Sequence, residues 1–250
     1  MDYFSDFSSR MTMTSLGSLH SLRHQGTGPK LLLLHGLGGN TKVWDRMVKF
    51  LPDEYDVTLL DLLGHGESAA PKIDYEMDIQ VKALKEFVDA TDCASAFIMG
   101  HSYGGWVAAS YSIGRQPKGL ILEDSAGLKD QFDEIRATED EIKYRENMIN
   151  ELLRMNNNKE YVMRSIAEAN LERSHLTHEM LEQIHAPTLI LWGANDKVID
   201  RKFADVFHEH IAGSALKVVE GAGHSGHYSH AEEVAVAVVG FVSASTYGNH

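Results

Sequence analysis

Short apolar runs and amphipathic segments alternate along most of the chain. Runs of four or five apolar residues, such as 31–34, have the length of buried strands and end at glycine or polar residues. Between the runs, apolar residues recur at three- and four-residue spacing, as in 77–88, which is typical of a helix packed on a sheet. The strands expected from this pattern are 30–34, 57–60, 96–99, 119–122, 188–192 and 215–219.

The repeated order of strand, loop and helix predicts an α/β fold with a mostly parallel sheet and helices on both faces. Residues 1–28 are polar and rich in turn formers, which favours one or two edge strands. Helical spacing also predicts a helix over 43–51, just before Pro52, and a final helix over about 231–242.

The segment 129–185 departs from the alternating pattern. It is highly charged, shows helical spacing throughout and carries no strand signal. Its apolar faces include Met148, Leu152 and Met155, and then Leu176, Met180 and Ile184. We interpret it as a helical lid inserted between two parts of an α/β core, 1–128 and 186–250.

Composition narrows the class of protein. The 250 residues are 43% hydrophobic, enough for one large domain, and the formal net charge is −13. That charge argues against nucleic acid or an anionic membrane as a partner, because both select basic surfaces. The single cysteine, Cys93, excludes an internal disulfide. We expect a cytoplasmic protein without a signal peptide or membrane span, and the sequence predicts no oligomeric state.

Residues 100–104 read Gly-His-Ser-Tyr-Gly and lie between an expected strand and an expected helix. This context distinguishes a nucleophile elbow, in which a strained serine projects at a sharp strand-to-helix turn, from a chance match. Gly100 and Gly104 leave room for the turn, and the helix that follows directs backbone N–H groups towards Ser102.

A second glycine-rich loop follows the strand 30–34 and reads His-Gly-Leu-Gly-Gly over 35–39. Glycine lets a backbone approach a reacting carbonyl, so we interpret the loop as part of an oxyanion hole with the N–H of Leu37 as one donor. Asp61 also ends a strand, but we expect it to cap the following turn through backbone hydrogen bonds.

A serine hydroxyl needs a neighbouring base, and that base needs a carboxylate to orient it. Ser102, Asp196 and His224 each follow an expected strand and occur in that order. The order Ser, Asp, His is that of α/β-hydrolases and differs from the orders in two other serine hydrolase folds.

Five segments together resemble the α/β-hydrolase superfamily over nearly the whole chain. They are 35–39, 61–68, 100–105, 192–196 and 223–224. The resemblance implies the α/β-hydrolase fold, with Ser102 as nucleophile, His224 as base and Asp196 as acid. It also implies the N–H groups of Leu37 and Tyr103 as oxyanion donors. Members often carry a proline shortly after the acid. Here Asp200 occupies that place, which predicts a changed helix start.

Other residues compete for these roles. Asp124 follows the strand after Ser102, where some members of the superfamily place the acid, and His227 lies close to His224. We favour Asp196 over Asp124, and expect His227 to shape the loop. Structural roles are expected for three histidines beside glycines: His35, His65 and His101. The histidines show no compact metal-ligand spacing, so we expect neither a metal nor a cofactor.

The leading functional hypothesis is a serine carboxylesterase that cleaves a small-molecule ester with a small or medium acyl group. A hydrolase of C–C bonds in ring-fission diketones would use the same triad and lid. A ligand receptor with slow turnover on the same fold is a further alternative. Ser102 argues against epoxide hydrolases and dehalogenases of this fold, which use an aspartate nucleophile.

Overall fold

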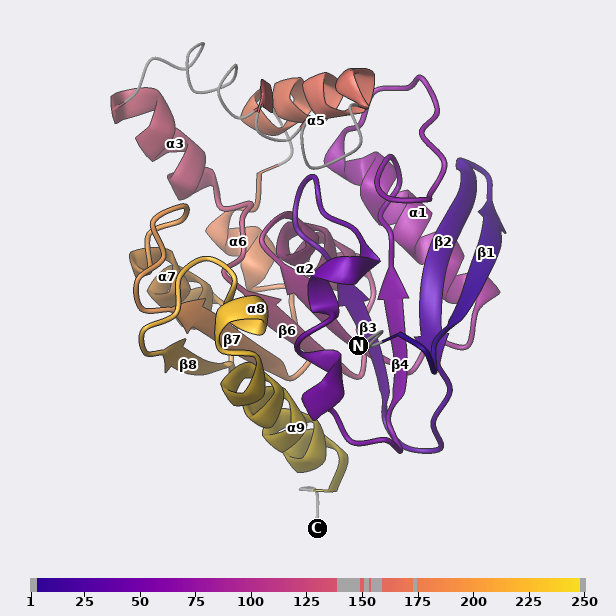
Figure 1. Cartoon of the computed structure of the whole chain (residues 1–250). Helices are drawn as coiled ribbons and strands as arrows, with labels where there is room; N and C mark the ends of the chain where they lie inside the picture. The colour runs from indigo at the N-terminus through magenta and orange to yellow at the C-terminus, as the bar shows by residue number, and fades with distance from the viewer. Residues whose placement is uncertain (1–3, 139–148, 151–152, 154–158, 173–174, 248–250) are drawn as a thin grey trace.

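The computed structural model describes residues 4–138, 149–150, 153, 159–172 and 175–247 (Figure 1). Its described strands form one sheet in the order β1-β2-β4-β3-β5-β6-β7-β8. The strands are β1 Ser8–Thr14, β2 Gly17–His24, β3 Lys30–Leu34, β4 Asp56–Leu60, β5 Phe97–His101, β6 Gly119–Glu123, β7 Thr188–Gly193 and β8 Ala215–Val219.

Most of the sheet is parallel. β1 and β2 pair antiparallel with each other, β2 pairs antiparallel with β4, and every pair from β4 to β8 is parallel. The six strands expected from the apolar runs are therefore confirmed to within two residues at each end. The strands expected within 1–28 are β1, at the edge of the sheet, and β2 beside it. In a parallel sheet the carboxyl ends of the strands meet at one edge, which is where sites form.

Helices cover both faces of this sheet. Those on the described residues are η1 Thr41–Trp44, η2 Val48–Phe50, α1 Met77–Ala90, α2 Tyr103–Gly114, α3 Lys129–Thr138, α5 Glu160–Glu172, α6 His178–Leu181, α7 Lys202–His210, α8 Gly226–Ser229 and α9 Ala231–Tyr247.

Two apolar cores lie on the two sides of the sheet. In β3, Leu32 and Leu34 pack into the core that contains residues of α1, α2 and α7, whereas Leu31 and Leu33 pack into the core that contains residues of η1 and α9. Alternate side chains of a strand point to opposite faces, so a run of leucines fills both cores. The sheet is thus held rigidly from both sides.

Two expectations about helices were wrong in detail. The segment expected as one helix over 43–51 forms two short 3₁₀ helices, η1 and η2. Trp44, at the end of η1, and Met47, in the turn between the two helices, are both fully buried. The final helix also runs five residues further than expected, to Tyr247, and the short α8 precedes it.

The described parts of 129–185 are mainly helical, as expected, and include α3, α5 and α6. Figure 1 shows α3 and α5 at the top of the view, the side towards which the arrow of β4 points. One parallel bridge joins Leu128 to Leu176, which the sequence did not indicate, and Leu176 and Ile184 are fully buried. Met148, Leu152 and Met155 lie outside the described residues. The lid boundaries at 129 and 185 stay a prediction.

Among the helices that the structure describes, none combines the length and the apolar character needed to span a bilayer.

Candidate active site

Ser102 lies in the sharp turn between β5 and α2, with φ 52° and ψ −115°. Its N–H donates to the Glu123 carbonyl at 2.9 Å, and its own carbonyl accepts from the N–H groups of Trp106 and Ala126 at 3.1 Å each. Among the described non-glycine residues, Ser102 and Asp124 are the two with positive φ. Such strained backbone concentrates at functional sites, where the surrounding hydrogen bonds maintain it.

The flanking glycines are required because three backbone segments meet here. A Cβ on Gly100 would lie 2.2 Å from the Gly104 carbonyl oxygen, and a Cβ on Gly104 would lie 2.4 Å from the Leu34 oxygen. Real Cβ atoms do not tolerate such distances. The spacing of glycine around Ser102 therefore follows from the close approach of β3, β5 and α2.

The structure brings Ser102, His224 and Asp196 together from three loops at the carboxyl edge of the sheet. His224 Nε2 lies 3.0 Å from Ser102 Oγ, and His224 Nδ1 lies 2.7 Å from Asp196 Oδ2. The Asp196 side chain is fully buried. A carboxylate only accepts hydrogen bonds, so it holds the imidazole proton on Nδ1 and leaves Nε2 to accept the serine proton.

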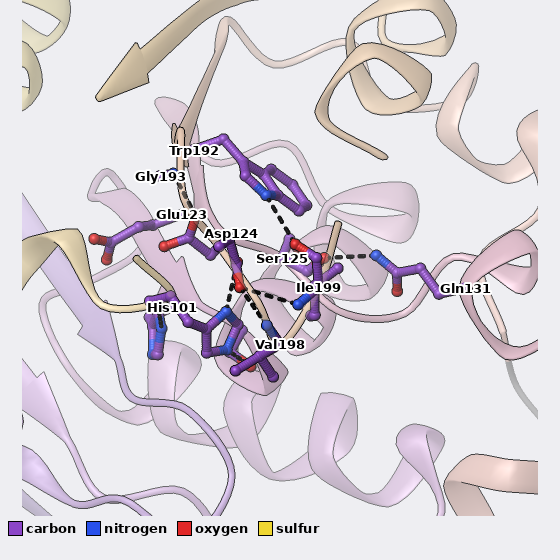
Figure 2. A network of polar contacts seen from close by, with 12 residues as sticks. His101, Glu123, Asp124, Ser125, Gln131, Trp192, Gly193, Val198 and Ile199 are labelled. Carbon is purple, nitrogen blue, oxygen red and sulfur yellow. Dashed lines mark hydrogen bonds and ion pairs between the residues drawn. The ribbon is translucent and has the colours of Figure 1, made fainter. Parts of the chain in front are cut away.

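Backbone donors fix Asp196 on the loop after β7. Its Oδ1 accepts the N–H groups of Val198 at 2.7 Å and Ile199 at 3.0 Å, two residues that Figure 2 labels. Asp200, in place of a proline, accepts the N–H of Lys202 at 2.9 Å, where α7 begins. The Asp200 carboxylate thus binds the first N–H of α7, and a changed helix start relative to other family members stays a prediction.

The loop with Leu37 lies beside the nucleophile. A Cβ on Gly36 would stand 3.4 Å from Ser102 Cβ. The Gly36 carbonyl accepts from Gly39 N–H at 3.0 Å and from His35 Nδ1 at 2.7 Å, while His35 Nε2 accepts from Leu62 N–H at 3.0 Å. In a trans peptide the N–H points away from the carbonyl, so this anchoring also sets the direction of Leu37 N–H.

The N–H of Tyr103 is the first of α2, and the opening N–H groups of a helix have no intrahelical acceptor. Within the described part of the chain, neither Leu37 N–H nor Tyr103 N–H has a hydrogen-bond acceptor. Both donors are available for a ligand, which supports the oxyanion-hole prediction.

Two further histidines surround the candidate triad. His101 Nε2 donates to the His224 carbonyl at 2.6 Å, so it holds the backbone of the candidate base. Burial, with His227 and His224 nearby, lowers the pKa of His101 well below its usual value, and its ring stays neutral. His227 Nδ1 and N–H both bond Glu123, at 2.8 and 2.7 Å, so among the described residues His227 anchors α8 and makes no hydrogen bond to Ser102.

Sequence reasoning did not single out Glu123, although the signal was present. It is a charged residue at the end of a buried strand and is 1% exposed, as is uncommon for glutamate without a partner. Its partner His227 lies more than a hundred residues away, and only the fold pairs them.

Asp124, the rival acid, is fully buried but does not bond His224. Its Oδ1 accepts Gly193 N–H at 2.8 Å. Figure 2 shows Asp124 among His101, Glu123 and Gly193, which end β5, β6 and β7. Asp61 takes the expected capping role, because its carboxylate accepts the N–H groups of Thr41 and Glu67.

One group of side chains in the described residues has metal-ligand spacing: His101, Asp124 and His224, whose ligand atoms lie within 4.8 Å of one another. His224 already uses both ring nitrogens for Ser102 and Asp196. The group therefore overlaps the candidate triad and is not a separate metal centre.

Fold and site geometry together define a class of protein. The chain belongs to the alpha/beta hydrolase family, whose sequence profile matches residues 31–238. Monoacylglycerol lipase abhd6-B of Xenopus laevis is 28% identical over 240 residues, covering 80% of this chain and 71% of the relative.

Solved structures agree on the fold. A membrane phospholipase A described as a bacterial virulence factor superposes with a TM-score of 0.82 at 22% identity, covering 98% of this chain and 89% of the other. An esterase from Exiguobacterium antarcticum gives a TM-score of 0.76 at 24% identity, covering 91% and 96%. The relative named a monoacylglycerol lipase supports ester hydrolysis as the general activity, whereas these solved structures show the fold alone.

Proposed function

We propose that the protein is a serine carboxylesterase that cleaves esters with small or medium acyl groups through an acyl-enzyme. The observation that carries the proposal is the continuous line of two hydrogen bonds from Ser102 Oγ through His224 to Asp196. A serine arranged in this way gains a base within reach and a carboxylate that stabilises the imidazolium.

In the first half-reaction Ser102 Oγ attacks the ester carbonyl carbon while its proton passes to His224 Nε2. The carbonyl oxygen becomes an oxyanion, and the N–H groups of Leu37 and Tyr103 stabilise it. The tetrahedral intermediate then breaks its bond to the alcohol oxygen, which takes the proton from His224. The products are a free alcohol and an acyl group on Ser102.

In the second half-reaction His224 takes a proton from water, and the hydroxide oxygen attacks the acyl carbon. The intermediate releases Ser102 Oγ, which regains its proton from His224, and the carboxylic acid departs. Asp196 keeps the ring oriented throughout and faces the charged imidazolium in both halves.

The relatives named monoacylglycerol lipases add one substrate class to the proposal, the ester of glycerol with a single acyl chain. We therefore propose a panel of monoacylglycerols beside simple esters as the substrates to test.

The test compares wild type with Ser102→Ala on p-nitrophenyl esters and monoacylglycerols graded by chain length. Removing the nucleophile is expected to lower kcat by about 10⁴- to 10⁶-fold, as in other triads. Equal rates for the two proteins would overturn the proposal. Cleavage of a dienoate diketone without cleavage of esters would favour the C–C hydrolase instead.

A further inference from the structure

Asp124 is a buried acid for which the proposed mechanism has no use. It follows β6 directly, is fully buried and adopts a φ of 46°. Oδ1 accepts the Gly193 N–H, but Oδ2 completes no hydrogen bond within the described part of the chain. A charged, partly unsatisfied carboxylate in such a place is costly, so its protonation state requires an explanation.

The neighbours of Asp124 disfavour its charged form. Burial is the largest cause, followed by the carboxylate of Glu123, with a smaller contribution from Asp196. The N–H groups of Gly193 and Gly226 favour the charged form but do not outweigh these effects. Together they raise the pKa of Asp124 to about 9. Asp124 is therefore an uncharged carboxylic acid at neutral pH.

This neutral acid lies beside the candidate base. One carboxyl oxygen of Asp124 and one ring nitrogen each of His101 and His224 all lie within 4.8 Å of one another. His101 is neutral and uses its Nε2 for the His224 carbonyl, so it does not compensate a charge on Asp124. Two carboxyl groups thus flank His224. Asp196 bonds it directly, and Asp124 lies close enough for one water molecule to bridge the two side chains.

We propose that Asp124 is a reserve positioning acid, held neutral while Asp196 is present and able to take over as the carboxylate partner of His224 when Asp196 is removed. The inference rests on the proposed serine hydrolase function. Without the Asp196 charge, one repulsive contribution disappears and Asp124 loses its proton more easily. The space left by the Asp196 side chain can hold a water that links Asp124 to His224 Nδ1.

The experiment is a double-mutant cycle read as a pH profile of kcat/KM on p-nitrophenyl butyrate from pH 6 to 10. Asp196→Ala is expected to lose about 10²-fold at pH 7, against the roughly 10⁴-fold usual for loss of a triad acid. The activity should then recover about tenfold towards pH 9, as Asp124 ionises. Adding Asp124→Asn should abolish this recovery and cost a further tenfold or more. Asp124→Asn alone should cost at most about threefold, because asparagine still accepts the Gly193 N–H.

A control adds Asp89→Asn to Asp196→Ala. Asp89 lies on α1 and bonds Arg115 at the surface, away from the loops that carry Asp124, Asp196 and His224. Its replacement should leave the recovery of activity towards pH 9 unchanged. A flat profile for Asp196→Ala, or the same profile with and without Asp124, would overturn the inference. A purely structural role for Asp124 would lower all rates without changing the shape of the profile.

Two readouts separate this inference from the esterase proposal. The infrared band of a protonated carboxylic acid should be present at pH 7, weaken as pH passes about 9, and be missing in Asp124→Asn. Its absence in wild type overturns the inference whether or not any ester is cleaved. Labelling of Ser102 by a fluorophosphonate measures activation of the nucleophile without an ester. Its rate should follow the same pH profiles as kcat/KM in wild type, Asp196→Ala, Asp124→Asn and the double variant.

Discussion

At the scale of single residues, the site depends on backbone that most amino acids could not adopt or approach. Ser102 has a positive φ, and the glycines around it allow β3, β5 and α2 to touch. The backbone strain and the close packing together expose the Ser102 hydroxyl beside His224.

The crowding gives a prediction about Gly104. Its Cβ would meet the carbonyl oxygens of Leu34 and His35 at 2.4 and 2.5 Å, and backbone cannot move aside cheaply. We expect Gly104→Ala to lower the melting temperature and to reduce ester hydrolysis at least tenfold. The matched control is Gly114→Ala near the end of the same helix, where a Cβ meets nothing within 4 Å.

Gly114→Ala should leave hydrolysis unchanged and be neutral or stabilising by up to about 1 kcal/mol, because alanine favours a helix. Differential scanning calorimetry and an ester assay on both variants check the pair. Similar losses in the two variants would show that the close approach around Gly104 does not matter.

At the scale of elements, the described part of the lid segment is packed as core. Val162, Met163 and Ile166 of α5 are buried in the same apolar cluster as α1 and α2. Ser165 Oγ also accepts the Tyr75 N–H at 2.9 Å. An element held in this way contributes to the stability of the whole domain.

Ile166 tests this role of α5. It is fully buried, so Ile166→Ala removes apolar contacts and leaves a cavity, at a cost of about 2–4 kcal/mol in the free energy of unfolding. Glu168→Ala, exposed on the same helix, should stay within about 0.5 kcal/mol. Urea unfolding followed by circular dichroism measures both. A lid that opens independently of the core would instead make the two variants alike.

At the scale of the whole molecule, buried histidines couple stability to pH. Burial lowers the pKa of His35, and lowers those of His65 and His101 further, so all three stay neutral in the folded protein. In the unfolded chain they take up protons below about pH 6.5. Asp124 acts in the opposite direction, because the folded protein keeps a proton that the unfolded chain releases.

The sign follows from this count of protons. Below about pH 6.5 the unfolded chain binds up to three extra protons on histidine, and the folded protein one on Asp124. The net difference of two favours unfolding as pH falls. We expect the free energy of unfolding to decrease from pH 7 to pH 5 by at most about 2.7 kcal/mol per pH unit.

Urea unfolding at pH 7, 6 and 5 measures this slope. His65→Gln should reduce it, because one buried neutral imidazole is gone, whereas His185→Gln at the exposed end of the lid segment should leave it unchanged. Stability that is constant or higher at pH 5 would contradict the expectation.

Much of the architecture was readable in advance. The strands from β3 to β7 match their apolar runs closely because a strand buried on both faces is mostly apolar. The elbow and the loop with Leu37 were readable because glycine is the residue that such close backbone approach demands. The prediction of one helix over 43–51 was wrong because the apolar spacing fits an α-helix as well as two short 3₁₀ helices, so spacing alone could not distinguish them.

The sequence by itself determined the order of strands and helices and the residues that stand at the strand ends, because local backbone geometry and burial dictate both. Only the tertiary structure decided which acid meets His224, that Glu123 holds His227, and that Oδ2 of Asp124 lies beside them without a hydrogen-bond partner among the described residues. Those choices depend on distances between loops from different strands, and such distances are set when the sheet assembles.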